Sequence, residues 1–433
     1  MLEKKFKLTK AGTNVKTEIR AGLVTFMTMA YIMIVNPAIL EAAGIPRGPS
    51  LVATILTVIF GTLIMSFHAN RPFAVAPLMG ENAFVAYTVC QVLGYPWPMA
   101  LAAVFLSGAL VTLLTITRLR RRLVDAIPPG ITYALAVGIG LFLAFIGFVT
   151  SGIVRLGTPE APLHLGRVAS PRVLLAIFCF LLIAVLMIRR LRGAILIGIL
   201  TTTSISILAG LTPLPTAVIS LPPSLKPVFF KLDFSGILDW KFLPVILTMF
   251  LMDFLDMMGT LIGCSAQAGF LDQHGNLPEI QKPMLADSLA SVFGALVGTT
   301  TSGTYVESAA GIQEGGRTGL TALVVALLFA LGLLFAPLLT MVPPQAYGPA
   351  LIIVGLMMLE PIRRIRFEDV SELIPAFVII TLMSFTFNIG VGLIAGFTVY
   401  PLAKIAAGRV KEVNWGMWTL FALSVLFFIF YPY

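Results

Sequence analysis

Long apolar runs alternate along the chain with short polar or basic interruptions. An apolar run of about 20 residues is long enough for a helix to cross the hydrocarbon core of a bilayer. The pattern predicts membrane-spanning helices at about 19–40, 51–67, 99–117, 129–149, 173–188, 193–211, 242–264, 284–297, 320–339, 347–359, 373–387 and 389–406. Between two of these spans, residues 151–170 are predicted to form a polar loop. The pattern therefore predicts an all-α polytopic membrane protein.

Two further segments are interrupted by glycine, proline and polar residues. Residues 73–93 begin F-A-V-A-P-L-M-G-E-N-A-F, and residues 300–317 read T-T-S-G-T-Y-V-E-S-A-A-G-I-Q-E-G-G-R. Irregular backbone is tolerated at membrane depth only where protein buries it or where it lines a cavity. The first break carries Glu81 and the second carries Glu307, and a carboxylate inside the membrane indicates a functional site. Counting both breaks, we predict about fourteen membrane segments.

The two halves of the chain share an order of features. Each half opens with a span containing polar residues, has its broken segment two segments later, and closes on two spans joined by a tight turn. Because each half has an odd number of spans, the second copy must be inverted relative to the first. We predict a cytoplasmic N-terminus at 1–18, a first seven-span repeat at 19–211, an irregular connector at 212–240, a second seven-span repeat at 241–407, and a C-terminal helix at 408–433 that is interfacial or an extra span. Paired broken segments indicate a transporter site at the repeat interface.

Composition and charge support a membrane protein. Of 433 residues, 58% are hydrophobic and 11% are charged, whereas soluble proteins carry roughly 25% charged residues. The net charge of +9 comes largely from clusters at 118–122, 189–192, 363–366 and 409–411, which all fall in the cytoplasm if the N-terminus does. The basic excess therefore sets membrane orientation and does not indicate nucleic-acid binding. No signal peptide is expected.

The cysteines and histidines show no disulfide or metal-ligand spacing, and the chain has no nucleotide-binding or hydrolase motif. We therefore expect no cofactor and no metal. The candidate chemistry rests on carboxylates instead. Asp253 and Asp256 lie three residues apart in F-L-M-D-F-L-D-M-M-G-T, so they share one helical face. A carboxyl group at membrane depth can take up a proton, which makes Glu307, Asp256, Asp253 and Glu81 candidates for proton coupling.

The break around Glu307 also suits a planar ligand. A carboxylate there can accept two N–H bonds from a heterocycle. Asn82 can donate and accept hydrogen bonds, and an aromatic ring such as Phe26 or Phe84 can stack on the ligand. Glu314 and Arg317, at the exit of the break, are expected to form a solvated pair at a membrane surface.

Four motifs resemble the AzgA-like purine permease branch of the nucleobase–cation symporter family, which is related to the nucleobase–ascorbate transporters. They are A-G-L-V-T-F-M-T-M-A-Y-I-M-I-V-N-P, M-G-E-N-A-F-V-A-Y-T-V, D-F-L-D-M-M-G-T-L-I-G and T-Y-V-E-S-A-A-G-I-Q-E-G-G-R-T-G-L-T, between residues 21 and 322. The resemblance implies two inverted seven-span repeats divided into a core and a gate domain, with short extended stretches in segments 3 and 10. It also implies import of nucleobases with protons, and a homodimer formed through the gate domain.

The resemblance further implies particular site residues. Substrate carboxylates would be Asp256 on the eighth segment and Glu307 on the tenth, with Asn82 on the third segment and Thr260 one turn after Asp256. The substrate-binding set that we predict is Glu307, Asp256, Asn82, Thr260, Phe26, Thr25, Phe84 and Tyr305.

The chain departs from the family pattern at two places. Glu81 in L-M-G-E-N-A stands where the family usually has leucine in G-M-G-L-N-A, and F-N-I-G-V-G-L lacks the acidic residue that many relatives carry in the thirteenth segment. The preferred purine (adenine, guanine or hypoxanthine), the coupling ion (proton or sodium) and the role of Glu81 therefore stay open.

The leading hypothesis is a proton-coupled purine importer of the plasma membrane that works by alternating access. One alternative is a carrier of another nucleobase or of an inorganic anion on the same fold, and two acidic residues facing the site argue against the anion. A second alternative is an intramembrane acid–base enzyme, which the lack of histidine at ligand spacing disfavours.

Overall fold

The computed structural model describes residues 2–117, 127–158, 161–215, 217–237, 239, 241–273 and 276–430. The basic cluster at 118–122 and His274 lie outside these residues. Within them, nine helices are long and apolar enough to cross a membrane. They are Val15–Glu41 (α2 and α3), Arg47–Ala69 (α4 and η1), Trp97–Thr117 (α6), Pro129–Thr150 (α8), Pro171–Ile188 (α9), Leu243–Gln267 (α11), Gly319–Thr340 (α14 to α15), Pro344–Arg364 (α16 and η4) and Ile389–Ala406 (α18).

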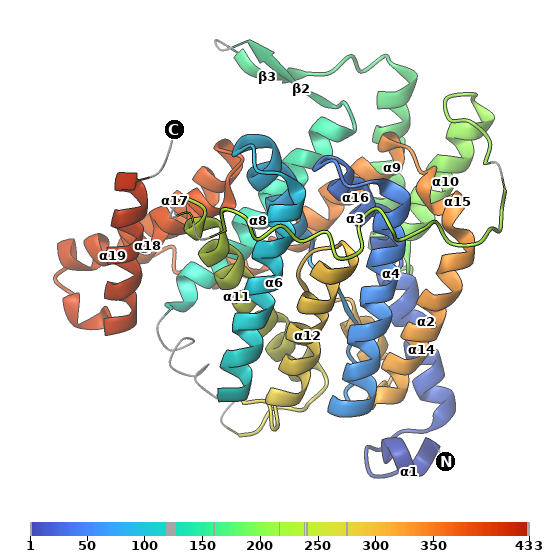
Figure 1. Cartoon of the computed structure of the whole chain (residues 1–433), viewed down its shortest axis with the longest axis horizontal. Coiled ribbons are helices and arrows are strands. Elements are labelled where there is room, and N and C mark those ends of the chain that lie inside the picture. Colours follow the sequence, from blue (N-terminus) through green and yellow to red (C-terminus); the bar gives the residue numbers. More distant parts are fainter. Residues whose placement is uncertain are drawn as a thin grey trace.

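Four more helices complete the bundle that Figure 1 shows, namely α10 (Ala194–Leu208), α12 (Gln281–Val297), α17 (Val370–Phe385) and α19 (Trp415–Phe430). The short helix α1 (Leu2–Phe6) lies at the end of the molecule that we name the N-terminal face. The expectation of a polytopic, all-helical chain is confirmed. The predicted boundaries of the two repeats stay a prediction.

The two broken segments meet in the interior. Strand β1 (Val75–Pro77) pairs antiparallel with β4 (Ser302–Thr304), with Ala76 opposite Gly303. The ladder continues on both sides, because Leu78 N donates to Thr301 O at 2.9 Å and Tyr305 N donates to Ala74 O at 2.9 Å. Extended backbone at this depth would leave polar groups unsatisfied, and each break supplies the partners that the other needs. The predicted extended stretches are therefore confirmed, and each leads into a short helix: α5 (Met79–Ala83), continued by η2 (Phe84–Val92), and α13 (Ser308–Gln313).

Helix packing divides the chain into two bodies. In the core body, α12 packs on α4 and α6, α14 packs on α2 and α4, α11 packs on α6, and α13 packs on α2. In the gate body, α16 packs on α8, α9 and α10, and α17 packs on α8 and α18. Helix α19 packs on α18 at the edge of the molecule (Figure 1). The broken segments belong to the core, so the gate reaches them only across the junction between the bodies.

The region 151–170, predicted to be a polar loop, contains a β-hairpin. Strand β2 (Val154–Thr158) pairs antiparallel with β3 (Ala161–Leu165), with Leu156 opposite Leu163 and Arg155 opposite His164. Figure 1 shows the hairpin on the face opposite to the N-terminal face. The loop prediction was wrong because the segment alternates polar and apolar residues with a period of two, which is the pattern of a strand.

Glu18 of α2 binds the backbone that follows the second broken segment, and its side chain is fully buried. Its carboxylate accepts bonds from Arg317 N at 2.9 Å, Thr321 N at 3.1 Å and Thr321 Oγ1 at 2.6 Å. Thr321 lies in the first turn of α14 and Arg317 directly precedes the N-cap residue Thr318. Backbone amides in the first turn have no partner within the helix and favour a negative charge. Glu18 therefore holds the chain between α13 and α14 in place.

Candidate functional site

Glu307 lies at the break itself, directly before the first residue of α13. The residue as a whole is partly exposed. Tyr31, at the bend between α2 and α3, donates its hydroxyl to Glu307 Oε1 at 2.5 Å, and Thr28 Oγ1 donates to the Glu307 carbonyl at 3.4 Å. The carboxylate is therefore held by a helix that lies 276 residues away in sequence.

Asp256 is also partly exposed, on the face of α11 that carries Gly259, Thr260 and Gly263. A Cβ atom added at Gly259 or Gly263 would meet nothing within 4 Å, so open space lies in front of this face. Thr260 Oγ1 bonds back to the Asp256 carbonyl at 2.9 Å. Asp256 and Glu307 are close enough to interact electrostatically.

Three fully or almost fully buried carboxylates lie behind these two. Asp287 of α12 accepts the Thr304 hydroxyl at 3.0 Å from each oxygen, which ties α12 to β4. Ser107 Oγ donates to Asp253 Oδ2 at 3.4 Å. Glu81, at the start of α5, interacts electrostatically with Asp253 and Asp256. Among the described residues, Asp253 Oδ1 and Glu81 Oε1 have no hydrogen-bond partner. The five side chains form one acidic cluster at the crossing of the two breaks.

The other predicted site residues fall into two groups. Thr260 and Phe26 are partly exposed, and the Phe26 ring lies edge-on to Phe329 with centroids 5.3 Å apart. The remaining residues, Asn82, Thr25, Phe84 and Tyr305, are buried within the core.

Each buried residue has a defined place. Thr300 Oγ1 donates to Asn82 Oδ1, while Asn82 Nδ2 has no partner among the described residues. Tyr305 donates its hydroxyl to the Pro77 carbonyl at 2.7 Å and so links the two breaks. Thr25 of α2 lies against Gly311 of α13. A Cβ atom added to Gly311 would lie 2.1 Å from Thr25 Oγ1, so this close approach of the two helices requires glycine. The structure thus brings Glu307, Asp256, Thr260 and Phe26 to accessible positions and places the rest beneath them.

Sequence reasoning missed Tyr31, Asp287 and Thr304, which position the carboxylate and the strand. No local pattern marks Tyr31 or Thr304, because their roles appear only in contacts made on folding, whereas Asp287 could have been found as a carboxylate inside the predicted span 284–297. The expected pair of Glu314 with Arg317 was wrong. Glu314 pairs with Arg20 and Arg192, whereas Arg317 Nη1 donates to the carbonyls of Ile312 and Gly316, at 2.7 and 2.8 Å.

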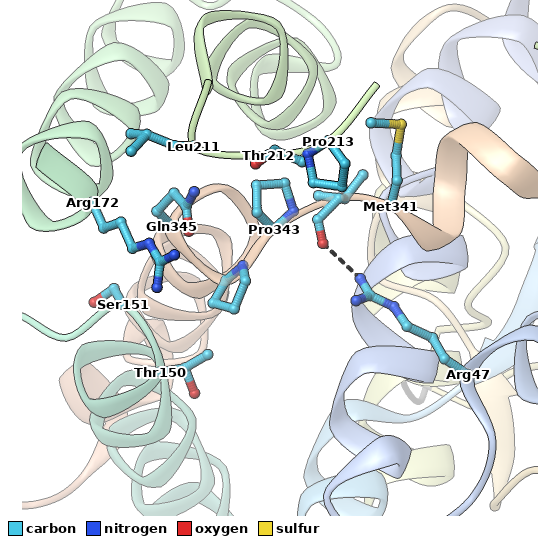
Figure 2. Close-up of a pocket in the computed structure, with 12 residues that line it drawn as sticks. Arg47, Thr150, Ser151, Arg172, Leu211, Thr212, Pro213, Met341, Pro343 and Gln345 are labelled. Atoms are coloured by element: carbon cyan, nitrogen blue, oxygen red, sulfur yellow. Dashed lines mark hydrogen bonds between the residues drawn. The ribbon is translucent and has the colours of Figure 1, made fainter. Parts of the chain in front are cut away.

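A separate cavity of about 450 Å³ opens near the face that carries the hairpin. Figure 2 shows Arg47 and Arg172 on opposite sides of it, with Gln345 and Pro343 between them. Arg47 Nη2 donates to the Val342 carbonyl at 2.8 Å. None of the five clustered carboxylates lines this cavity. It is therefore distinct from the acidic site.

Comparison with known proteins agrees with this geometry. Residues 16–395 match the model of a family described as the permease family, Xan_ur_permease. The chain belongs to this permease family. It is 39% identical over 414 residues to the adenine permease AdeP of Escherichia coli K12, covering 96% of this chain and 93% of AdeP. It is 38% identical over 436 residues to the guanine/hypoxanthine permease PbuG of Bacillus subtilis 168, covering 98% of this chain and 99% of PbuG.

These relatives confirm the resemblance to the AzgA-like branch. Since the family consists of permeases, this chain is a multi-pass membrane transporter and not an enzyme. The fold of the permease resembles the transmembrane domain of the cyanobacterial bicarbonate transporter BicA, with a TM-score of 0.65 and 16% identity over 88% of this chain and 97% of that domain. This likeness confirms the transporter fold.

The contact between Asp287 and Thr304 yields a test of how the permease holds β4. Thr304→Val removes the hydroxyl and leaves a buried carboxylate without its donor, which costs about 1–3 kcal/mol. We expect a lower Tm of the detergent-solubilised protein. Thr304→Ser keeps the hydroxyl and is the matched control. Equal Tm values for the valine and serine variants would contradict the role of this contact.

Proposed function

We propose that this permease imports purine nucleobases together with protons, with Glu307 and Asp256 holding the base. The similarity to an adenine permease and a guanine/hypoxanthine permease over nearly the whole chain supports a purine substrate. The observation that carries the proposal is the pair of partly exposed carboxylates, one fixed by Tyr31 at a helix break and one on α11 facing open space. Adenine, guanine and hypoxanthine are all candidate substrates.

The chemistry of the pair suits a purine better than an anion. Purines present N–H groups along a planar edge, and a carboxylate accepts such groups in bidentate fashion. An inorganic anion would be repelled by two carboxylates, with three more behind them. The acidic cluster therefore argues against the anion carrier, although the fold is shared with a bicarbonate transporter.

The remaining predicted residues would complete the contact with the base. Thr260 lies one turn beyond Asp256 on the same open face, and Phe26 presents a partly exposed ring that can stack on the base. Asn82 Nδ2 is a buried donor without a partner among the described residues, and it can donate to a ring nitrogen or oxo group that reaches it. The site would be supported from inside the core by three buried residues, Phe84, Tyr305 and Thr25.

Proton coupling is proposed to use the same cluster. Like charges in a low-dielectric interior cannot all stay ionised, so carboxyl groups that interact this closely share protons. The candidates are Glu307, Asp256, Asp253 and Glu81. Of these, Glu81 stands at a position where the family usually has leucine. A proton that enters the cluster with the base would reduce the charge that the core must carry across the membrane.

We place the permease in the plasma membrane with its N-terminus in the cytoplasm. The basic segments at 189–192, 363–366 and 409–411 support this orientation under the positive-inside rule. A homodimer through the gate domain is part of the same proposal. Helix α19 is either an extra span or interfacial.

A competition assay tests the substrate class. In cells that lack their own purine uptake, excess adenine, guanine or hypoxanthine should lower the uptake of at least one radiolabelled purine, because the purines compete for one site. Excess uracil, sulfate or bicarbonate should not lower the uptake of the labelled purine. Competition by uracil would favour another nucleobase as the substrate, and uptake of labelled sulfate or bicarbonate would favour the anion carrier.

Replacement of the proposed anchor tests the site. Glu307→Gln keeps the shape but removes the charge that strengthens the hydrogen bonds to the base, so kcat/KM for purine uptake should fall about 10- to 100-fold at unchanged surface expression. Glu360→Gln changes a carboxylate that is 59% exposed on the surface and serves as the control. Full activity of Glu307→Gln would remove Glu307 from the site.

The coupling ion can be separated from the substrate. A protonophore should abolish the accumulation of purine against its gradient, whereas replacing sodium by choline should not. The reverse result would assign coupling to sodium and would leave the purine claim intact.

A further inference from the structure

The two faces of the junction between core and gate differ in this structure. Along α11, the face that carries Asp256 becomes more exposed toward the helix end on the N-terminal face, where Gly263, Ala266 and Gln267 are exposed. On the opposite side, the core meets the gate at the turn between α17 and α18. Thr88 Oγ1 donates to the Phe387 carbonyl at 2.7 Å, and Thr88 is fully buried. The open space in front of Asp256 therefore leads along α11 toward the N-terminal face, whereas Thr88 contacts the gate on the other side.

Glu314 joins the core to the gate on the side of the N-terminal face. It follows the last residue of α13, and its side chain is only 10% exposed. Its Oε2 lies 3.0 Å from Arg20 Nε of α2, and its Oε1 bonds Arg192 Nη2. Arg20 belongs to the core, whereas Arg192 lies between α9 and α10 of the gate. One carboxylate thus holds one arginine from each body.

The backbone at this point is also in close contact across the junction. Gly193, the neighbour of Arg192, has φ +72°, and a Cβ added to it would sit 3.1 Å from the Met27 carbonyl of α2. The gate therefore abuts the core here through glycine backbone, and the Arg192–Glu314 pair lies directly beside the contact.

We propose that the Arg192–Glu314 ion pair holds the arrangement of core and gate seen in this structure and must break before the permease can open on the face opposite to the N-terminal face, which is the outward face in the proposed orientation. The proposal rests on the proposed orientation with the N-terminus inside. Glu307 and Glu314 lie at the two ends of the short helix α13, so a movement that carries Glu307 past the gate carries Glu314 away from Arg192. The Arg20–Glu314 pair stays within the core and moves as a unit. The ion pair therefore links the position of the site carboxylate to the arrangement of the two bodies.

A single-cysteine labelling experiment tests this proposal. Thr88→Cys, in a chain whose Cys90, Cys179 and Cys264 are replaced by alanine, reports separation of core and gate at this point because Thr88 is buried and bonds the Phe387 carbonyl. The reagent is a membrane-impermeant maleimide applied to right-side-out vesicles. Adding Arg192→Gln should raise the labelling rate about two- to fivefold, since the loss of a half-exposed ion pair raises the population of the minor state by that factor.

The controls separate the ion pair from other effects. Arg20→Gln removes the partner of Glu314 that lies within the core and should leave the rate unchanged, and Arg192→Lys keeps the charge and should label like the parent. No rise with Arg192→Gln, or an equal rise with Arg20→Gln, would overturn the proposal. Labelling confined to inside-out vesicles would instead overturn the proposed orientation. The assay contains no substrate, so its outcome does not depend on which base is transported.

Discussion

The antiparallel pairing of β1 with β4 is the constraint on which the rest of this structure depends. Backbone without helical hydrogen bonds has no place in the interior of a membrane protein unless its N–H and C=O groups find partners. Each break supplies those partners for the other, and Tyr305 adds a side-chain bond to Pro77. The pairing brings two distant parts of the chain together and leaves two short helices beginning beside it. That arrangement gives Glu307 its position at the start of α13.

The acidic cluster follows from this arrangement. Glu81 and Glu307 belong to the two breaks, while Asp253 and Asp256 approach from α11 and Asp287 from α12. The cost of burying so many carboxylates is offset in part by specific donors, such as Thr304 for Asp287 and Tyr31 for Glu307. Only Asp256 and Glu307 keep partial exposure. In the proposed function, the buried members hold or pass protons, and the two partly exposed residues also contact the base.

The division into core and gate connects the site to transport. The carboxylates belong entirely to the core, and in the proposed function the gate controls which side of the membrane they face. Polar contacts join the two bodies across the junction, as in Thr88 with Phe387 and Glu314 with Arg192. Contacts of this kind can be exchanged without disturbing the apolar packing inside either body, which suits bodies that move as rigid units.

The sequence by itself determined the class of the protein, the spans and the two broken segments, because apolar run length and glycine or proline breaks are local properties. It also singled out Glu307, Asp256 and Glu81, since a carboxylate within an apolar run is conspicuous. Only the tertiary structure decided that Asn82, Phe84 and Tyr305 are buried, and that Tyr31 holds Glu307. It also found a hairpin where a loop was expected and paired Glu314 with Arg192 rather than with Arg317. These outcomes depend on which distant segments pack together, and a pattern of single residues carries no information about such contacts.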